Sequence, residues 1–241
     1  MCIIMSKPAG IEFPDIITLR NCWDNNPHGA GYAVAYREKV HIRKGFMTWE
    51  DFMESINFDQ LVKYSCVFHF RYATHGSRSG GNCHPFPVSG NLKQEEIRTY
   101  VAIAHNGVIP NIQITEDDYS DTMSYVSETI SPFWEYCKEK GARYMYSIKR
   151  NKENLLQETR SKWSFLFGDG KIINVGQGVR RDGIWYSNAG FQCSSYRLRR
   201  RPRKPGTQQA ALESLVSNIK AVQFASAYFD TEYCDPERCN W

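Results

Sequence analysis

The sequence predicts a mixed α+β domain whose strands pair mainly in antiparallel order. Short apolar stretches follow one another through tight turns, most clearly at 163–167 and 171–175, which Gly168-Asp169-Gly170 joins as a hairpin. Helix-like segments are few and do not alternate regularly with the strands, which argues against a parallel sheet built from βαβ units. The 241 residues, of which 41% are hydrophobic, suffice to bury the core of one domain.

Eight strands are expected, and each is a short run rich in apolar, β-branched or aromatic residues. In chain order the runs are 2–5, 32–36, 40–43, 65–71, 100–104, 163–167, 171–175 and 184–187. Residues 21–31 carry turn-forming Asn, Pro and Gly ahead of the second run, and a polar, glycine-rich loop is expected at 73–82 after the fourth.

Three helices are expected as well, at 48–56, 120–140 and 207–225. Thr48 stands in the N-cap position of the first helix. Ser120 or Asp121 caps the second helix, and Gly141 ends it. The third helix is predicted from apolar residues that recur at helical spacing.

The composition excludes several classes of protein. No apolar run approaches the ~20 residues that a membrane helix requires, and the mean hydropathy is −0.53. The N-terminus lacks the basic region and the long apolar stretch of a secretory signal. Eight cysteines, none of them in a CxxC pair, are too sparse for a disulfide scaffold. We expect a cytoplasmic protein with reduced cysteines and no membrane partner.

The positive charge is concentrated in one segment, Arg197–Lys204, which carries six basic residues in eight positions. Without it the chain has 24 basic and 26 acidic residues. We expect this segment to be a solvated linker, and the alternative is contact with the phosphates of a nucleic acid. With the helix and tail that follow, it forms a C-terminal part at 191–241, after a main domain at 1–190.

Cys2 is the first residue that could carry chemistry, because it directly follows the initiator methionine. Removal of Met1 would give Cys2 a free α-amine. Such an amine has a reference pKa of about 7.7–8.0, which suits a general base beside its own thiol. The alternative is a small buried hydrophobe in the first strand.

Arg71 leaves its strand into the glycine-rich loop, where a guanidinium group is well placed to bind a carboxylate through two hydrogen bonds. Four of the six histidines lie between positions 69 and 105. A metal site is therefore an alternative, with the ligands Cys66, His69, His75, Cys83 and His84. Their spacings match no standard zinc pattern, so we expect neither a metal nor a cofactor.

Two further motifs follow buried segments. At 104–107 the side-chain amide of Asn106 and the N–H of Gly107 are two donors suited to an oxyanion hole. Asn-Gly is equally typical of a plain turn, so the motif alone is weak. At 120–122, Asp121 considered by itself is no more than a helix cap.

Taken in chain order, these motifs resemble the glutaminase domain of class II glutamine amidotransferases. The matching elements are Cys2, RYATHG at 71–76, CHPF at 83–86, HNG at 105–107 and SDT at 120–122. The resemblance extends from Cys2 to about Asn188. It implies the fold of an N-terminal-nucleophile (Ntn) hydrolase, a four-layer αββα sandwich of two antiparallel sheets between helices.

The resemblance also implies a role for each matched residue. Cys2 would be the nucleophile, with its own α-amine as the base. Arg71 would bind the α-carboxylate of glutamine, and Asp121 would bind the α-ammonium. Asn106 and Gly107 would hold the oxyanion. The glutamine pocket would be lined by Thr74, His75 and Gly76.

The expected function is that of a stand-alone glutaminase subunit. It would hydrolyse glutamine to glutamate and ammonia, and pass the ammonia to a partner, an ammonia-accepting synthetase or amidating enzyme. About 50 residues follow Asn188, and they do not resemble a second catalytic domain. Two alternatives remain open, a γ-glutamyl amide hydrolase that transfers no ammonia and a nucleic-acid-associated module that keeps the fold.

Overall fold

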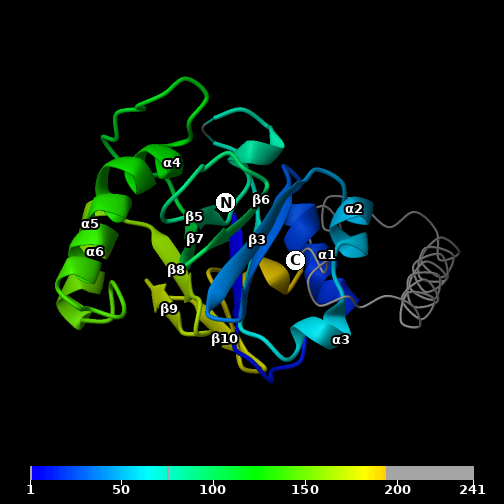
Figure 1. Cartoon of the computed structure of the whole chain (residues 1–241). Coiled ribbons are helices and arrows are strands. Elements are labelled where there is room, and N and C mark those ends of the chain that lie inside the picture. Colours follow the sequence, from blue (N-terminus) through cyan, green and yellow to red (C-terminus); the bar gives the residue numbers. More distant parts are fainter. Residues whose placement is uncertain (1, 75, 194–241) are drawn as a thin grey trace, which may run out of the picture. The chain divides into compact units, whose positions relative to one another are not determined.

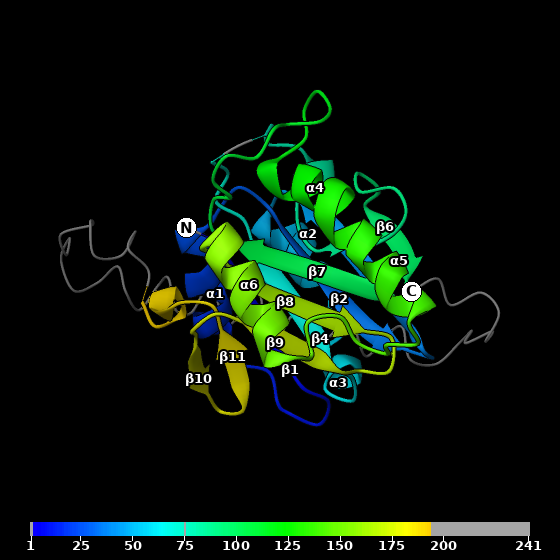
Figure 2. The same cartoon turned by 90° about the vertical axis from the view of Figure 1, so that its left-hand side faces the viewer.

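The computed structural model describes residues 2–74 and 76–193, which form four layers (Figure 1). Two β-sheets face each other in the middle, and helices cover the outer face of each sheet (Figure 2). The predicted α+β class, the antiparallel sheets and the αββα order of layers are confirmed. The predictions for His75, for the basic segment 197–204 and for the helix at 207–225 fall outside the described residues.

The larger sheet has seven strands in the order β10-β11-β1-β4-β2-β3-β6, and every neighbouring pair is antiparallel. In chain order they are β1 (Ile3–Lys7), β2 (Ala30–Tyr36), β3 (Lys39–Phe46), β4 (Cys66–Phe70), β6 (Glu96–Thr99), β10 (Val179–Arg181) and β11 (Ile184–Tyr186).

The smaller sheet has four strands in the order β5-β7-β8-β9, again antiparallel throughout. They are β5 (Phe86–Pro87), β7 (Val101–Asn106), β8 (Lys162–Phe167) and β9 (Ile172–Val175). All eight predicted strands are therefore present, with ends shifted by up to three residues. β7 runs through Asn106, so the chain leaves the sheet only at Gly107.

The helices are α1 (Ile16–Asn25), α2 (Trp49–Glu54), α3 (Phe58–Leu61), α4 (Asp121–Tyr125), α5 (Ser131–Glu139) and α6 (Lys149–Thr159). A π-helical turn, Val126–Ile130, joins α4 to α5, so the predicted helix at 120–140 is confirmed as one continuous segment. Ser120 is its cap, since its Oγ accepts a hydrogen bond from Met123 N at 3.2 Å. In the described part of the chain, the helices are too short or too polar to cross a membrane.

The prediction of a turn at 21–31 is wrong for its first half, because α1 continues to Asn25. Leu19, Cys22 and Trp23 share one face of α1 and are buried under the larger sheet. Burial of that face outweighs the low helix propensity of asparagine and aspartate. α6 has no comparable signal in the sequence, since it buries only two of its 11 residues.

Strand alternation decides which side chains lie between the two sheets, because successive residues point to opposite faces. In β1, Ile3 and Met5 pack against the outer helices, whereas Ile4 and Ser6 face the smaller sheet. Cys2 precedes β1 and continues the inward-facing row. The first candidate residue therefore stands at the edge of the layer between the sheets.

Lys7 ends β1 with a fully buried cation. Its Nζ lies 3.0–3.1 Å from the carbonyl oxygens of Pro8, Ile11, Val62 and Tyr64. The ammonium group thus joins the chain that leaves β1 to the chain that enters β4.

We expect Lys7→Met to lower the free energy of unfolding by about 3 kcal/mol, because several buried carbonyl groups lose their donor at ~1–3 kcal/mol each. Urea denaturation followed by tryptophan fluorescence measures the difference. Lys63→Met, at an exposed position, is the control and should change stability by less than ~0.5 kcal/mol. A loss below about 1 kcal/mol for Lys7→Met would contradict this role.

Candidate active site

Cys2 lies beside the end of β4, because β1 and β4 pair with Ile3 opposite Phe70. Its partly buried thiol contacts the backbone of Tyr72, whose N–H donates to Cys2 Sγ at 3.2 Å. The thiol can in turn donate to Tyr72 O at 3.5 Å. Burial raises the pKa of the Cys2 thiol, and the contacts with the Tyr72 backbone partly offset that rise. The sulfur therefore needs a base before it can act as a nucleophile at neutral pH.

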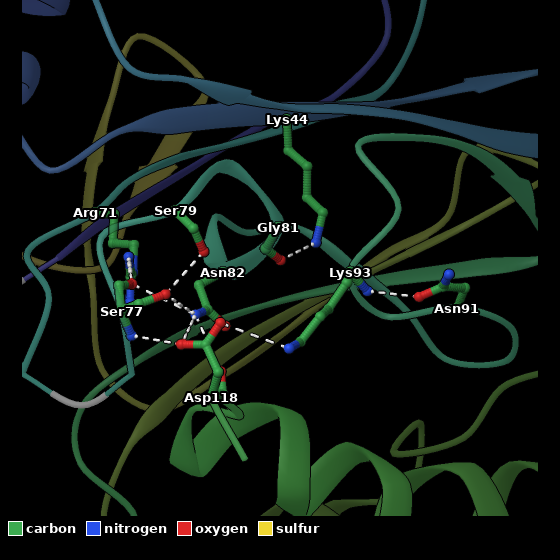
Figure 3. A network of polar contacts seen from close by, with 9 residues as sticks. All are labelled: Lys44, Arg71, Ser77, Ser79, Gly81, Asn82, Asn91, Lys93 and Asp118. Atoms are coloured by element: carbon green, nitrogen blue, oxygen red, sulfur yellow. Dashed lines mark hydrogen bonds and ion pairs between the residues drawn. The ribbon is translucent and has the colours of Figure 1, made fainter. Parts of the chain in front are cut away.

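Arg71 follows β4 and is 3% exposed. Its backbone is held in the sheet direction, since Arg71 N donates to Gly29 O at 2.8 Å and His28 N donates to Arg71 O at 3.0 Å. Its guanidinium Nη1 donates to Ser77 O at 2.8 Å, across the loop that follows (Figure 3). Burial lowers the pKa of the Arg71 guanidinium. The structure thus brings a buried cation next to Cys2.

Asp118 holds the loop beyond Arg71 in place (Figure 3). Its Oδ1 accepts from Ser77 N at 3.1 Å, and its backbone oxygen accepts from Asn82 Nδ2 at 3.1 Å. Lys93 Nζ lies 3.5 Å from the other carboxylate oxygen. Asp118 therefore ties the loop after β4 to the loop before α4. No local pattern in the sequence marks Asp118 or Asn82 for this role.

The predicted pocket residues lie on this same loop. Thr74 and Gly76 are exposed, and His75 lies outside the described residues. Gly76 has a φ of +72°, in the left-handed region that favours glycine. The loop starts from a fixed point, because Ala73 N donates to His28 Nδ1 at 2.9 Å and the His28 ring stacks on Tyr72. His28 is a supporting residue that no motif indicated.

Asn106 ends β7 and is joined to the Cys2 segment through Ser187. Its Nδ2 lies 2.8 Å from Ser187 Oγ, which also accepts from Ile4 N at 2.9 Å. The neighbouring Asn188 donates from Nδ2 to Cys2 O at 2.8 Å. Ser187 thus links Asn106 to the Cys2 end of β1, and Asn188 binds Cys2 itself; sequence reasoning missed both residues.

Gly107 has to be glycine, because a Cβ at this position would lie 2.1 Å from Ser161 Oγ. The buried Ser161 side chain, just before β8, therefore fills the space that a side chain at Gly107 would need. This requirement is independent of any role of its N–H group.

Asp121 is 6% exposed and lies in the first turn of α4 without capping it. Its Oδ2 accepts from Ile109 N at 2.9 Å, and its Oδ1 accepts from Thr122 N at 2.8 Å. The carboxylate thus fixes the turn that carries Gly107 against α4. Within residues 2–74 and 76–193, no ion pair joins Asp121 to a basic side chain.

Three buried histidines lie behind the site, His69, His84 and His105. The rings of His69 and His84 stack at 4.2 Å, and His105 Nδ1 lies 2.8 Å from Thr122 Oγ1. Burial lowers the pKa of His69 to about 3 and that of His105 to about 4, so both are neutral near pH 7. Cys66 faces the opposite side of β4, toward Leu61 O and Tyr64 O. Cys66 and His69, two of the alternative metal ligands, therefore lie on opposite faces of β4.

Comparison with known proteins gives a consistent result. The chain is 31% identical over 115 residues to a glutamine–fructose-6-phosphate aminotransferase of Pyrococcus horikoshii, which is 47% of this chain and 18% of that protein. It is 31% identical over 83 residues to an amidophosphoribosyltransferase of Methanocaldococcus jannaschii, which is 34% of this chain and 16% of that protein. The chain resembles class II glutamine amidotransferases.

These alignments span less than a fifth of the length of the curated relatives. No protein-family model matches the chain. The solved glutamine phosphoribosylpyrophosphate amidotransferase of B. subtilis aligns with 77% of this chain and 41% of its own at 17% identity, with a TM-score of 0.43. The four layers follow from the strand pairing and the buried clusters of this chain itself.

Lys44 on β3 binds the loop after β4 at Gly81 (Figure 3). Its Nζ donates to Gly81 O at 2.8 Å and to Leu92 O at 2.6 Å, and it lies over the ring of Phe86. Burial lowers the pKa of Lys44 to about 7. The folded chain therefore releases a proton between pH 7 and the ordinary lysine pKa, while the unfolded chain still holds it.

It follows that Lys44 contributes more to stability as pH rises from about 7 to about 10. The free energy of unfolding of the wild type, minus that of Lys44→Met, should rise by up to about 1.4 kcal/mol per pH unit in that window. Urea denaturation of both proteins at pH 7, 8 and 9 measures the difference, with Lys63→Met as the exposed control. A difference that does not change with pH would show that Lys44 stays charged when buried.

Proposed function

We propose that residues 1–190 form a glutaminase domain that hydrolyses glutamine to glutamate and ammonia, with Cys2 as the nucleophile. The observation that carries the proposal is that three segments come together where β1 begins and where β4 and β7 end. Cys2 contacts Tyr72, Arg71 precedes that residue, and Asn106 is joined to Ile4 through Ser187. The similarity to glutamine amidotransferases supports the same chemistry.

In the proposed reaction, removal of Met1 leaves Cys2 with a free α-amine. This amine takes the thiol proton while Sγ attacks the side-chain amide carbon of glutamine, which matches a thiol whose pKa burial has raised. The Asn106 amide and Gly107 N–H stabilise the oxyanion of the tetrahedral intermediate. The α-ammonium group then protonates the leaving nitrogen, and ammonia departs. Water hydrolyses the γ-glutamyl thioester to glutamate and regenerates the thiol.

Glutamine recognition is assigned to residues of opposite charge. Arg71 binds the α-carboxylate and Asp121 binds the α-ammonium group, while Thr74, His75 and Gly76 line the pocket. Both anchors are at least nine-tenths buried, so an unpaired substrate charge there would be costly. Asp121 already accepts two backbone hydrogen bonds, and its two oxygens retain capacity for a third.

The ammonia is proposed to reach an acceptor site outside the described residues. Free ammonia becomes protonated in water at neutral pH and loses its nucleophilicity, so transfer needs a path closed to solvent. The relatives that the chain resembles are an aminotransferase and a phosphoribosyltransferase, in which the aligned part is a small fraction of the protein.

The assignment of Cys2 predicts a processed and selectively reactive chain. The intact mass should lack Met1, and an electrophilic glutamine analogue should label Cys2 and none of the other seven cysteines. Cys2→Ala should abolish glutamine hydrolysis, whereas Cys193→Ala, at an exposed position, should leave it unchanged.

Full activity in a chain that keeps Met1 would sink the proposed base. Much faster turnover of a γ-glutamyl conjugate than of glutamine would favour a γ-glutamyl amide hydrolase instead. These outcomes are separable, because the first concerns the amine and the second concerns the substrate.

The assignment of Asp121 predicts a loss in glutamine recognition. Asp121→Asn keeps one acceptor oxygen and removes the charge, so kcat/KM for glutamine should fall about 10–100-fold, as expected for one charge-assisted hydrogen bond. Thermal melting should show that the fold persists. Ser120→Ala is the matched control, since it removes the cap and should lower stability by about 1 kcal/mol with glutamine kinetics retained. Wild-type kinetics in Asp121→Asn would limit Asp121 to holding the turn at Ile109.

A further inference from the structure

Ser187 lies between the strand that follows Cys2 and the amide of Asn106. Its Oγ accepts from Ile4 N at 2.9 Å and lies 2.8 Å from the Asn106 amide. Its backbone is pinned as well, since Ser187 N donates to Ile4 O at 2.9 Å and Lys162 Nζ donates to Ser187 O. The side chain is fully buried, so water does not compete for these bonds.

The hydrogen bonds around Asn106 do not balance when its Nδ2 faces Ser187. In that orientation Ser187 Oγ accepts twice, from Ile4 N and from Asn106 Nδ2. Asn106 Oδ1 is then a buried acceptor without a partner in the described part of the chain. A buried acceptor left unpaired is unfavourable by about 1–3 kcal/mol.

A half turn of the Asn106 amide pairs its oxygen with the Ser187 hydroxyl and leaves the two Nδ2 N–H bonds as the groups that need an acceptor. An asparagine amide has two orientations that exchange its oxygen and nitrogen, and the surrounding hydrogen bonds select one of them. With Oδ1 facing Ser187, the hydroxyl proton of Ser187 has an acceptor 2.8 Å away, and Ile4 N keeps its own acceptor. The bonds then run in one direction, from Ile4 N–H to the Ser187 hydroxyl and on to Asn106 Oδ1.

We propose that Ser187 is a positioning residue, whose hydroxyl donates to Asn106 Oδ1 and thereby turns both N–H bonds of the Asn106 amide away from the sheet layer. This inference rests on the proposed function for its catalytic consequence. An oxyanion needs a donor, and an amide oxygen in the same place would repel it. Ser187 favours this orientation because its oxygen already accepts from Ile4 N and its hydroxyl proton then has the amide oxygen as its acceptor.

The kinetic test uses Ser187→Ala, Asn106→Ala and the double variant in the full chain. Ser187→Ala should lower kcat at least ~10-fold with little change in KM, because the oxyanion forms only in the transition state. In the Asn106→Ala background the same change should lower kcat less than ~2-fold. Equal losses in both backgrounds would overturn the proposal, since Ser187 would then act independently of Asn106.

Ser6→Ala is the matched control. Ser6 is equally buried on β1 and bonds Ser164 Oγ at 2.8 Å and Asn174 Oδ1 at 3.1 Å, in the same layer. Its removal should lower stability and leave kcat unchanged. Ser187→Cys, which keeps a weak donor of similar size, provides a second variant if Ser187→Ala folds poorly.

NMR spectroscopy tests the orientation of the Asn106 amide without measuring glutamine hydrolysis. Selective ¹⁵N labelling of asparagine resolves the side-chain amide signals, and the signal lost in Asn106→Ala identifies Asn106. In Ser187→Ala or Ser187→Cys, loss of the bond to Oδ1 should shift the nitrogen and both amide protons together. A shift confined to one amide proton would show that Nδ2 donates to Ser187, and would overturn the proposal. If the wild type does not hydrolyse glutamine, the proposed function is refuted. The amide signals would still show whether the Ser187 hydroxyl donates to Asn106 Oδ1.

Discussion

The face-to-face packing of two antiparallel sheets is the constraint on which the rest of this structure depends. Sheets that pack this closely need small or apolar inner faces, and Ala33, Ala102 and Ala104 meet that need between the two sheets. A Cβ on Gly168 would lie 2.2 Å from Glu38 O, which shows how closely a loop of the smaller sheet approaches the β2–β3 turn. The buried hydroxyl groups of Ser6, Ser164 and Ser187 in this layer are each paired with another polar group.

Two groups of hydroxyl side chains obey that rule in different places. Ser6 and Ser164 bond each other in the middle of the layer, where they join the sheets. Ser187 bonds Ile4 and Asn106 at the edge, where the layer meets the end of β1. The same pairing of buried polar groups therefore holds the sheets together inside and holds the Asn106 amide at the edge. All three residues are serines, so their different partners follow from where each lies in the layer.

The loops around the site depend on partners from distant parts of the chain. Asp118 binds the loop after β4, and Asp121 binds the turn after β7, so the segment that leads into α4 holds both. The histidines behind them stay neutral because burial lowers the pKa of His69 and His105 far below 7. These two histidines therefore place no positive charge beside Asp121 near neutral pH.

Strand alternation and the order of motifs could be predicted from the sequence, because they depend on neighbouring residues. Apolar runs located all eight expected strands, Ser120 and Gly141 marked the ends of the long helix, and Cys2, Arg71 and Asn106 were marked by their positions beside strands. The helical state of residues 21–25 could not be predicted from the sequence. It depends on Cys22 and Trp23 packing against the larger sheet, whose strands come from distant parts of the chain. Ser187, Asn188 and Asp118 were equally hidden, because each acts on a residue far away in the chain. The sequence by itself determined which side chains point inward, and only the tertiary structure decided which of them meet, because hydrogen bonds between strand ends depend on the register and packing of the whole fold.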